Sequence, residues 1–273
     1  MKGTVNNHTY HLVTAKHIAD VIDPGSFVLG MNSKHGEKLL LHSGDEACWY
    51  YHPTEPDSVD VAVLNVSYDL NSLDIEWIAE ESFATPERIA ECGIGIGDEI
   101  NAVGLFTEFF GSTKHIPVVR SGNIAMMPTD KIPTKNYGEI EAYLVEGRSI
   151  GGLSGSPVFV RHTLERWDRQ RLVASVPGPF HFLGLLRGHW DIPIELTQQQ
   201  AEAVNMGISI VIPAKKVLET LNNPRLVDMR RQVDEQLKKK HYPTDDIAKP
   251  KFTKEDFQRT LTKVTRKIEP KKD

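Results

Sequence analysis

Short runs of apolar and β-branched residues, separated by glycine, proline, asparagine or aspartate, recur through the first 212 residues of this chain. Several of these runs alternate apolar and polar residues, which is the period of a half-buried strand. Many short strands with turn residues between them favour an all-β sandwich or barrel over βαβ units. The expected strands are Tyr10–Ala15, Asp60–Val66, Glu99–Leu105, Ile116–Arg120, Gly122–Met126, Ile140–Val145, Pro157–Val160, Phe182–Leu186 and Ile208–Ile212.

Helices are expected at the end of the chain. Pro213 stands at a favourable first position for one helix, and Asn223-Pro224 opens a second. Thr253 opens a third, with Asp256 in the position of a weak capping box. The apolar positions of the second helix follow a helical period: Leu226, Met229, Val233 and Leu237.

The chain has 273 residues, of which 40% are hydrophobic and 25% charged, the profile of a soluble globular protein. Its net charge of −5 is unevenly distributed, because residues 223–273 carry +6 and residues 1–222 carry −11. This shift in composition predicts a boundary near Asn222, between an acidic body and a basic tail.

Cysteine content and hydropathy indicate the compartment. Cys48 and Cys92 are too few for a disulfide scaffold, so we expect free thiols, with a single bridge as the alternative. The sequence contains no apolar run of signal-peptide length and no stretch of the roughly 18 apolar residues that would span a membrane. As written, the chain is expected to be cytoplasmic.

Three segments have residues suited to catalysis. The run Thr14-Ala15-Lys16-His17 ends an apolar strand in a histidine, the side chain best suited to act as a general base near neutral pH. Asp60 heads the apolar strand Asp60-Val61-Ala62-Val63-Leu64, where a buried carboxylate needs a partner such as a histidine N–H. Taken alone, His17 could equally be an ordinary surface or hydrogen-bonded histidine, and Asp60 could simply cap the strand in solvent.

The third segment is Gly151-Gly152-Leu153-Ser154-Gly155-Ser156-Pro157. Glycines on both sides of Ser154 allow a tight turn, so that the N–H groups of Gly152 and Ser154 can point into one anion-binding nest. Donors so placed stabilise the oxyanion of a tetrahedral intermediate. The alternative is an ordinary glycine-rich β-turn.

Together, the three segments resemble the signature blocks of the trypsin-like (chymotrypsin-fold) serine peptidases, in the order His17, Asp60, Ser154. The strands Ile96–Gly104 and Gly207–Pro213 are similar to those of the bacterial branch that includes the high-temperature-requirement proteases. The resemblance covers about residues 10–221. The 52 residues after Leu221 are too few for the PDZ domain of many members of that branch.

The resemblance implies two six-stranded antiparallel β-barrels, with the active site in the cleft between them. We expect the first barrel in residues 1–108, the second in residues 109–222 and a basic helical tail in residues 223–273. It further implies that Ser154 attacks the scissile carbonyl, that His17 transfers the proton and that Asp60 orients His17. It implies a polypeptide substrate and neither a metal nor an organic cofactor.

The resemblance also suggests where a substrate pocket would lie. Arg148, six residues before Ser154, corresponds to the pocket floor, where an inward arginine would favour an acidic or C-terminal carboxylate partner. The run from Gly184 to His189 would form the pocket wall, with Arg187 and His189 as candidate contacts. The alternative for these three residues is a plain surface position.

The start of the chain departs from the family pattern. His17 follows only 16 residues, whereas the family places two strands before the one that leads into the histidine. Either the true start lies upstream, where a secretion signal could stand, or the first barrel lacks its N-terminal strands.

The sequence leaves three other functions to weigh against a peptidase. The main alternative is a catalytically silent, peptidase-like module that binds a peptide or protein. An α/β-hydrolase is excluded because the motif lacks its closing glycine and the histidine precedes the serine. The two basic tail helices could dock on the acidic body, bind a partner or bind nucleic acid. Nucleic-acid binding by the Lys238-Lys239-Lys240 run is the least favoured, since charged helices most often pack on their own protein. The sequence does not indicate the oligomeric state.

Overall fold

The structure is a computed structural model, and it describes residues 10–22, 27–44, 47–66, 72–106, 108–109, 111–134, 138–147, 152–161, 165–168, 171–174, 178–197 and 200–239. The chain divides into two units, Met1–Asp234 and Glu235–Asp273. Of the second unit the structure describes only the end of one helix, so the following account concerns the first.

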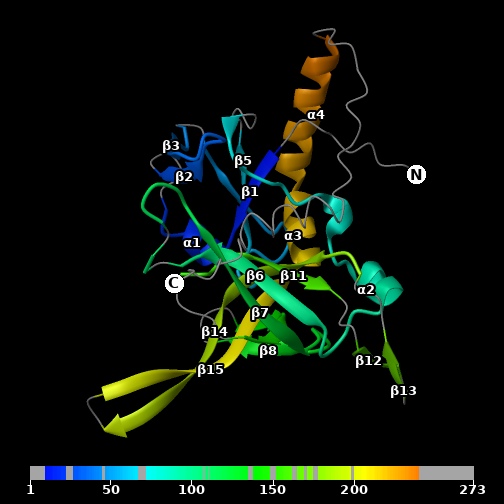
Figure 1. Ribbon diagram of the computed structural model, residues 1–273. Coiled ribbons are helices and arrows are strands. Elements are labelled where there is room, and N and C mark those ends of the chain that lie inside the picture. The colour runs from blue at the N-terminus through cyan, green and yellow to red at the C-terminus, as the bar shows by residue number, and fades with distance from the viewer. Residues whose placement is uncertain are drawn as a thin grey trace, which may run out of the picture. The chain divides into compact units, whose positions relative to one another are not determined.

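Six antiparallel strands close into a barrel (Figure 1). Around the barrel the order is β10–β15–β14–β11–β6–β7, and every neighbouring pair is antiparallel. A buried apolar cluster that includes Ile100, Ile124, Val158, Leu183 and Val211 forms one core of the protein. The strands are β6 (Glu99–Leu105), β7 (Pro117–Met126), β10 (Tyr143–Glu146), β11 (Pro157–Arg161), β14 (His181–Thr197) and β15 (Gln200–Pro213).

Two of these strands run on past the barrel. β14 and β15 remain paired from Gly184↔Pro213 to Thr197↔Gln200, and they project as a long hairpin in Figure 1. Two further hairpins are β8 (Lys131–Thr134) with β9 (Gly138–Glu141), and β12 (Glu165–Asp168) with β13 (Arg171–Ala174).

The N-terminal strands form a three-stranded sheet, in the order β1 (Tyr10–Thr14), β5 (Ala62–Val66), β4 (Trp49–Tyr51). β2 (Val28–Asn32) and β3 (Lys38–His42) pair separately. The segment leading into β5 is buried on both faces: Val61 and Val63 join one apolar cluster, while Ala62 and Leu64 join another. This alternation follows from the two-residue period of a strand.

The expected all-β class with helices near the end is confirmed. One closed six-stranded barrel is present, but the described N-terminal strands form the two small sheets rather than a second closed barrel. β6 pairs with β7 and β11 in the closed barrel, although the expected boundary at residue 108 places it with the N-terminal strands. The division into 1–108, 109–222 and 223–273 itself stays a prediction.

Two of the expected strands are joined into one, and a third is divided. The segments expected at 116–120 and 122–126 form one strand, β7, because Gly122 serves close approach rather than a turn: a Cβ there would lie 1.9 Å from the Glu146 carbonyl oxygen. The segment expected at 140–145 is divided at Ala142 between β9 and β10.

Helices α3 (Ala214–Leu221) and α4 (Pro224–Lys239) begin close to where Pro213 and Asn223-Pro224 predict them. Two short helices were not predicted, α1 (Lys16–Ala19) and α2 (Pro86–Cys92), and neither was the 3₁₀ turn η2 (Glu80–Ser82). The third expected helix, from Thr253, and Lys240 lie outside the described residues. None of the described helices is long and apolar enough to cross a membrane. Cys48 and Cys92 are both free thiols.

The first part of α4 packs against the N-terminal sheet. Leu226 is fully buried, and Met229 packs beside the same apolar cluster. Arg230 and Met229 line a small pocket together with His11 of β1 and Asn65 of β5. Among the described residues, neither ring nitrogen of His11 has a hydrogen-bond partner. Burial, with the Arg230 charge beside it, lowers the pKa of His11 to about 4.

This buried histidine should make the fold sensitive to acid. In the unfolded chain His11 takes up a proton as the pH falls below about 6.5, whereas in the folded protein it stays neutral until about pH 4. The free energy of unfolding is therefore highest above about pH 6.5 and falls by about 3 kcal/mol as the pH is lowered from 6.5 to 4. Urea unfolding at pH 7, 5.5 and 4 measures this loss.

His11→Gln is expected to remove that part of the pH dependence, and His35→Gln, at an exposed position, is expected to leave it unchanged. Equal pH dependence in wild type and His11→Gln would contradict the expectation.

Candidate active site

β1 and β5 bring His17 and Asp60 together. Their antiparallel register pairs Thr14 with Ala62, so the residues just beyond each strand meet at one end of the sheet. His17 lies in α1, directly after β1, and its backbone N–H donates to Oδ1 of Asp60 at 2.9 Å. Its ring Nδ1 lies 2.8 Å from Oδ2.

This geometry fixes the tautomer of the histidine. The Asp60 side chain is 1% exposed, and as a carboxylate it can only accept hydrogen bonds. Nδ1 of His17 therefore carries the proton, and Nε2 of the neutral ring has its lone pair available to a substrate or nucleophile. A solvent-exposed capping role for Asp60 is wrong, because the carboxylate is buried and paired.

Ser154 lies in a tight turn between two glycines. Gly152 and Gly155 have φ of 93° and 81°, in the left-handed region that glycine adopts without strain. The turn is tied to β14 because the Gly155 N–H donates to the carbonyl of Leu186 at 2.7 Å. Within the turn, the Ser156 N–H donates to the carbonyl of Leu153 at 3.0 Å.

The same turn touches the segment that carries His17. A Cβ on Gly155 would lie 2.5 Å from Oγ1 of Thr14 and 3.1 Å from the backbone nitrogen of Ala15. Only a residue without a side chain allows this contact. Gly155 thus brings Ser154 next to the strand that ends at His17.

The Ser154 hydroxyl donates to the backbone carbonyl of Arg187 at 2.9 Å. Among the described residues no hydrogen bond joins Ser154 to His17. The structure thus pairs His17 with Asp60 and packs the turn bearing Ser154 against the His17 segment, while the hydroxyl itself faces β14.

Arg187 approaches both parts of the site. Its carbonyl accepts the Ser154 hydroxyl, and its Nε lies 3.3 Å from Oδ2 of Asp60. The side chain is 16% exposed, so a plain surface position is wrong for Arg187. It contacts the buried acid, and its assignment to a substrate pocket stays a prediction.

The side chains of the other two expected pocket residues lie outside the described part of the chain. Arg148 lies outside the described residues. The backbone of His189 pairs with Ser209 in the barrel, but its side chain is also outside what is described. The oxyanion role of the Gly152 and Ser154 N–H groups stays a prediction.

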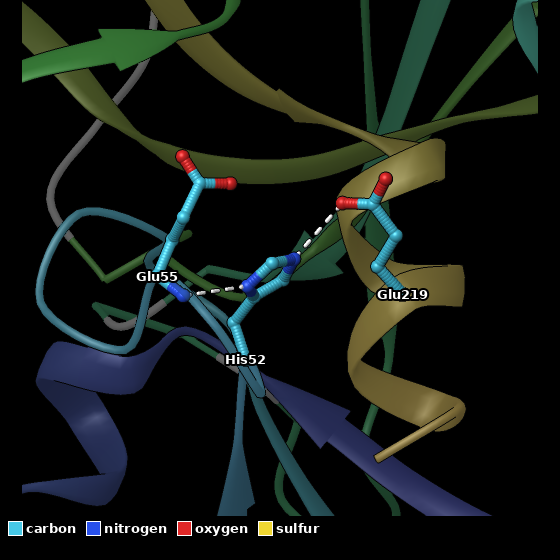
Figure 2. Close-up of side chains that lie close together, drawn as sticks. All are labelled: His52, Glu55 and Glu219. Atoms are coloured by element: carbon cyan, nitrogen blue, oxygen red, sulfur yellow. Dashed lines mark hydrogen bonds and ion pairs between the residues drawn. The ribbon is translucent and has the colours of Figure 1, made fainter.

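A second cluster of polar side chains joins the N-terminal segment to α3. Figure 2 shows His52, Glu55 and Glu219 close together. Nε2 of His52 lies 2.9 Å from Oε2 of Glu219, and the Glu55 N–H donates to Nδ1 of His52 at 3.0 Å. Lys216 joins the cluster: its ammonium group donates to Glu55 and lies 3.4 Å from Oε2 of Glu219.

This cluster already contains its own cation. Because Nδ1 of His52 accepts a backbone N–H, Nε2 carries the ring proton and points it at Glu219. The hydrogen bond from Lys216 holds the pKa of Glu55 below its usual range. Burial opposes the charge on Lys216, but the surrounding carboxylates outweigh it and raise the pKa of the ammonium group. A metal ion here would have to displace both the Lys216 ammonium and the His52 proton, so the cluster fits a salt-bridge network better than a metal site.

Sequence reasoning did not identify this network. Its members are separated by up to 167 residues, and none stands in a motif with metal-ligand or catalytic spacing. Arg187 was identified only as a pocket contact, because no sequence signal connects it to Asp60.

No family model matches the chain, and no curated protein matches it. Among solved structures, the chain is similar to one titled "Crystal structure of Deg5", with 14% sequence identity and a TM-score of 0.41. The match covers 76% of this chain and 75% of that chain. We draw no functional conclusion from this likeness.

Gly155→Ala tests the contact between the Ser154 turn and the His17 segment. The new methyl group would meet Thr14 and Ala15 in addition to imposing the left-handed strain. Gly36→Ala is the matched control, because Gly36 has φ of 85° and nothing within 4 Å of its Cβ position. We expect the control to cost about 1 kcal/mol and Gly155→Ala about 2 kcal/mol more, measured by urea unfolding. An equal loss of unfolding free energy in Gly155→Ala and Gly36→Ala would show that Gly155 does not closely contact Thr14 and Ala15.

Lys216→Met tests the salt-bridge network. The substitution leaves Glu55 and Glu219 together without their shared cation, so we expect a loss of about 1–2 kcal/mol in the free energy of unfolding. The neighbouring Lys215 is 44% exposed and lies 3.8 Å from Oε1 of Glu219, so Lys215→Met should cost less than about 0.5 kcal/mol. A similar loss in the two variants would contradict a role specific to Lys216.

Proposed function

We propose that this chain is a serine peptidase of the trypsin-like class, with His17, Asp60 and Ser154 as its triad and a polypeptide as its substrate. The observation that carries the proposal is the buried Asp60 carboxylate, which accepts both the backbone N–H and the ring Nδ1–H of His17. A histidine held in this way presents Nε2 as a base. Within this class, the sequence motifs favour the branch that includes the high-temperature-requirement proteases.

In the proposed reaction Oγ of Ser154 attacks the scissile carbonyl carbon, and its proton passes to Nε2 of His17. Asp60 stabilises the imidazolium that forms, and His17 then protonates the leaving amine. Water, deprotonated by His17, attacks the acyl group and releases Ser154. Before the first step the Ser154 hydroxyl has to turn from the Arg187 carbonyl to His17, which is a rotation about its Cα–Cβ bond.

The turn around Ser154 would also supply the oxyanion hole. The backbone N–H groups of Gly152 and Ser154 are the proposed donors, and the left-handed φ of Gly152 is compatible with a nest of N–H groups at this turn. Loss of one such donor typically costs about 3–4 kcal/mol of transition-state stabilisation.

One observation favours a second candidate, a peptidase-like module that binds a peptide without cleaving it. The Ser154 hydroxyl is hydrogen-bonded to a main-chain carbonyl and not to His17. If this arrangement persists when a peptide is bound, the serine is not activated. The two functions predict different behaviour toward an active-site-directed reagent.

Labelling with a fluorophosphonate distinguishes them. We expect wild-type protein to be phosphonylated on Ser154, and Ser154→Ala to take no label, because the turn that bears Ser154 packs against the segment that leads to His17. Asp60→Asn should label roughly 10⁴-fold more slowly, since an amide does not hold His17 in the required tautomer. Mass spectrometry of the labelled peptide gives the site.

Ser156→Ala is the matched control, because Ser156 belongs to the same turn but has no role in the proposed reaction. It should label like wild type. A folded wild-type protein that takes no label, together with peptide binding that Ser154→Ala does not alter, would establish the binding module instead.

A further inference from the structure

Residues 74–81 form an irregular connection between the N-terminal strands and the barrel. At the start of this segment Leu73 is buried, and the Asp74 N–H donates to the last carbonyl of β2 at 2.8 Å. At its end η2 leads to Phe83, which is buried and packs against Phe182 of β14, with ring centroids 4.8 Å apart. Buried side chains therefore anchor both ends of the segment and leave the residues between them at the surface.

The middle of the segment exposes apolar side chains. Trp77, Ile78 and Ala79 are consecutive and all exposed, the first two by 49% and 38%. The Trp77 ring contacts Tyr10 of β1, with centroids 5.8 Å apart, so the indole is held against the protein while half of its surface stays open. Three exposed apolar residues in a row are unfavourable in water unless they serve a contact. Tryptophan is also among the side chains most enriched at the centres of protein–protein interfaces.

Carboxylates flank this apolar centre on both sides in the sequence. Residues 72–84 contain four acids and no lysine, arginine or histidine: Asp74, Glu76, Glu80 and Glu81. All four are exposed, and among the described residues none of them forms an ion pair. Arg230 of α4 is close enough to Glu80 for an electrostatic interaction, so this acid is partly compensated. We call residues 74–81 the acidic strip.

We propose that the acidic strip binds a basic amphipathic segment of a partner protein. An apolar side chain of the partner packs on Trp77 and Ile78, and its lysine or arginine side chains meet the carboxylates on either side. An arginine can also stack on the open part of the indole, because a guanidinium is attracted to an aromatic face. The excess of negative charge repels nucleic acids and anionic membranes from the same surface. A polypeptide that carries positive charge is therefore the partner that complements the strip.

The acidic strip is separate from the candidate active site. Tyr10, which Trp77 contacts, begins β1, whereas Thr14 ends this strand and leads into His17. The two ends of a five-residue strand lie about 13 Å apart. Binding at the acidic strip therefore requires no part of the proposed triad, and the partner need not be a substrate.

NMR with a synthetic peptide tests where binding occurs. The probe is a helical peptide with leucines spaced by three and four residues, arginines beside them and alanine elsewhere, and its counterpart has glutamate in place of arginine. The indole N–H signal of Trp77, identified by its loss in Trp77→Phe, should shift with the arginine peptide and not with the glutamate peptide. The indole signal of the buried Trp49 should stay in place. An arginine peptide that leaves the Trp77 signal unmoved overturns the proposal, and so does an equal shift with both peptides.

Substitutions at the apolar centre measure its contribution. Trp77→Ala should weaken binding of the fluorescently labelled arginine peptide about 10-fold or more, measured by anisotropy, and Ile78→Ser should weaken it by a smaller factor. Leu40→Ala is the matched control, because Leu40 is an apolar residue of β3 that is 72% exposed, and its affinity should stay within about 2-fold of wild type. Thermal unfolding first establishes that each variant is folded, and two strip variants are used so that either one suffices. Folded strip variants that bind as tightly as Leu40→Ala would show the proposal to be wrong.

Substitutions of the acids separate the acidic strip from the overall charge of the protein. Glu76→Gln/Glu81→Gln should weaken binding of the arginine peptide about 5-fold at low salt, and the difference from wild type should shrink at high salt. The control Glu37→Gln/Glu146→Gln removes the same charge from two exposed positions outside the strip and should change the affinity by less than about 2-fold. Equal weakening in the two double variants would mean that the peptide responds only to net charge, which would refute binding at the strip.

Discussion

The Asp60 carboxylate is almost completely buried, so its negative charge has to be compensated by groups that are fixed in place. Three groups meet this requirement: the backbone N–H and the ring of His17 donate hydrogen bonds to the carboxylate, and the Arg187 guanidinium forms an ion pair with it. Two of them belong to His17 in α1, just after β1, and the third comes from β14 of the barrel. The requirement to neutralise one carboxylate therefore links the N-terminal sheet to the barrel at the candidate site.

Other contacts support this link at a distance from the chemistry. Lys216 and Glu219 of α3 hold the segment that contains His52 and Glu55, while Leu226 of α4 is buried in the same apolar cluster as Val61 and Val63. This cluster lies next to Asp60 in the sequence, because Val59 and Val61 flank the acid and are buried too. Packing around β5 thus sets the position of the carboxylate, and the carboxylate sets the position of His17.

Much of the strand pattern was predictable, because it depends on local sequence. β6 matches its expected limits, and the other expected strands were found with shifted ends. Gly122 was wrongly interpreted as a turn residue. The sequence does not distinguish a glycine required by the close approach of a neighbouring carbonyl from a glycine required by a turn. Helix α2 had a local signal that was overlooked: Thr85 caps it by accepting from the Arg88 N–H, and Pro86 follows. Strands β2, β3 and β4 are less regular in sequence and depend on their partners.

The sequence by itself determined the all-β class and the residue types of the candidate triad, because strand period and glycine-flanked turns are encoded over a few neighbouring residues. It also indicated that Asp60 needs a partner, since a carboxylate leading into an apolar strand is costly to bury alone. Only the tertiary structure decided which partners those are. The β1–β5 register brings His17 to Asp60, a bulge in β14 directs Arg187 to the same oxygen, and the Ser154 hydroxyl bonds to a carbonyl of that bulge. These contacts join residues 33 to 127 positions apart, and no local pattern encodes a distance between such residues.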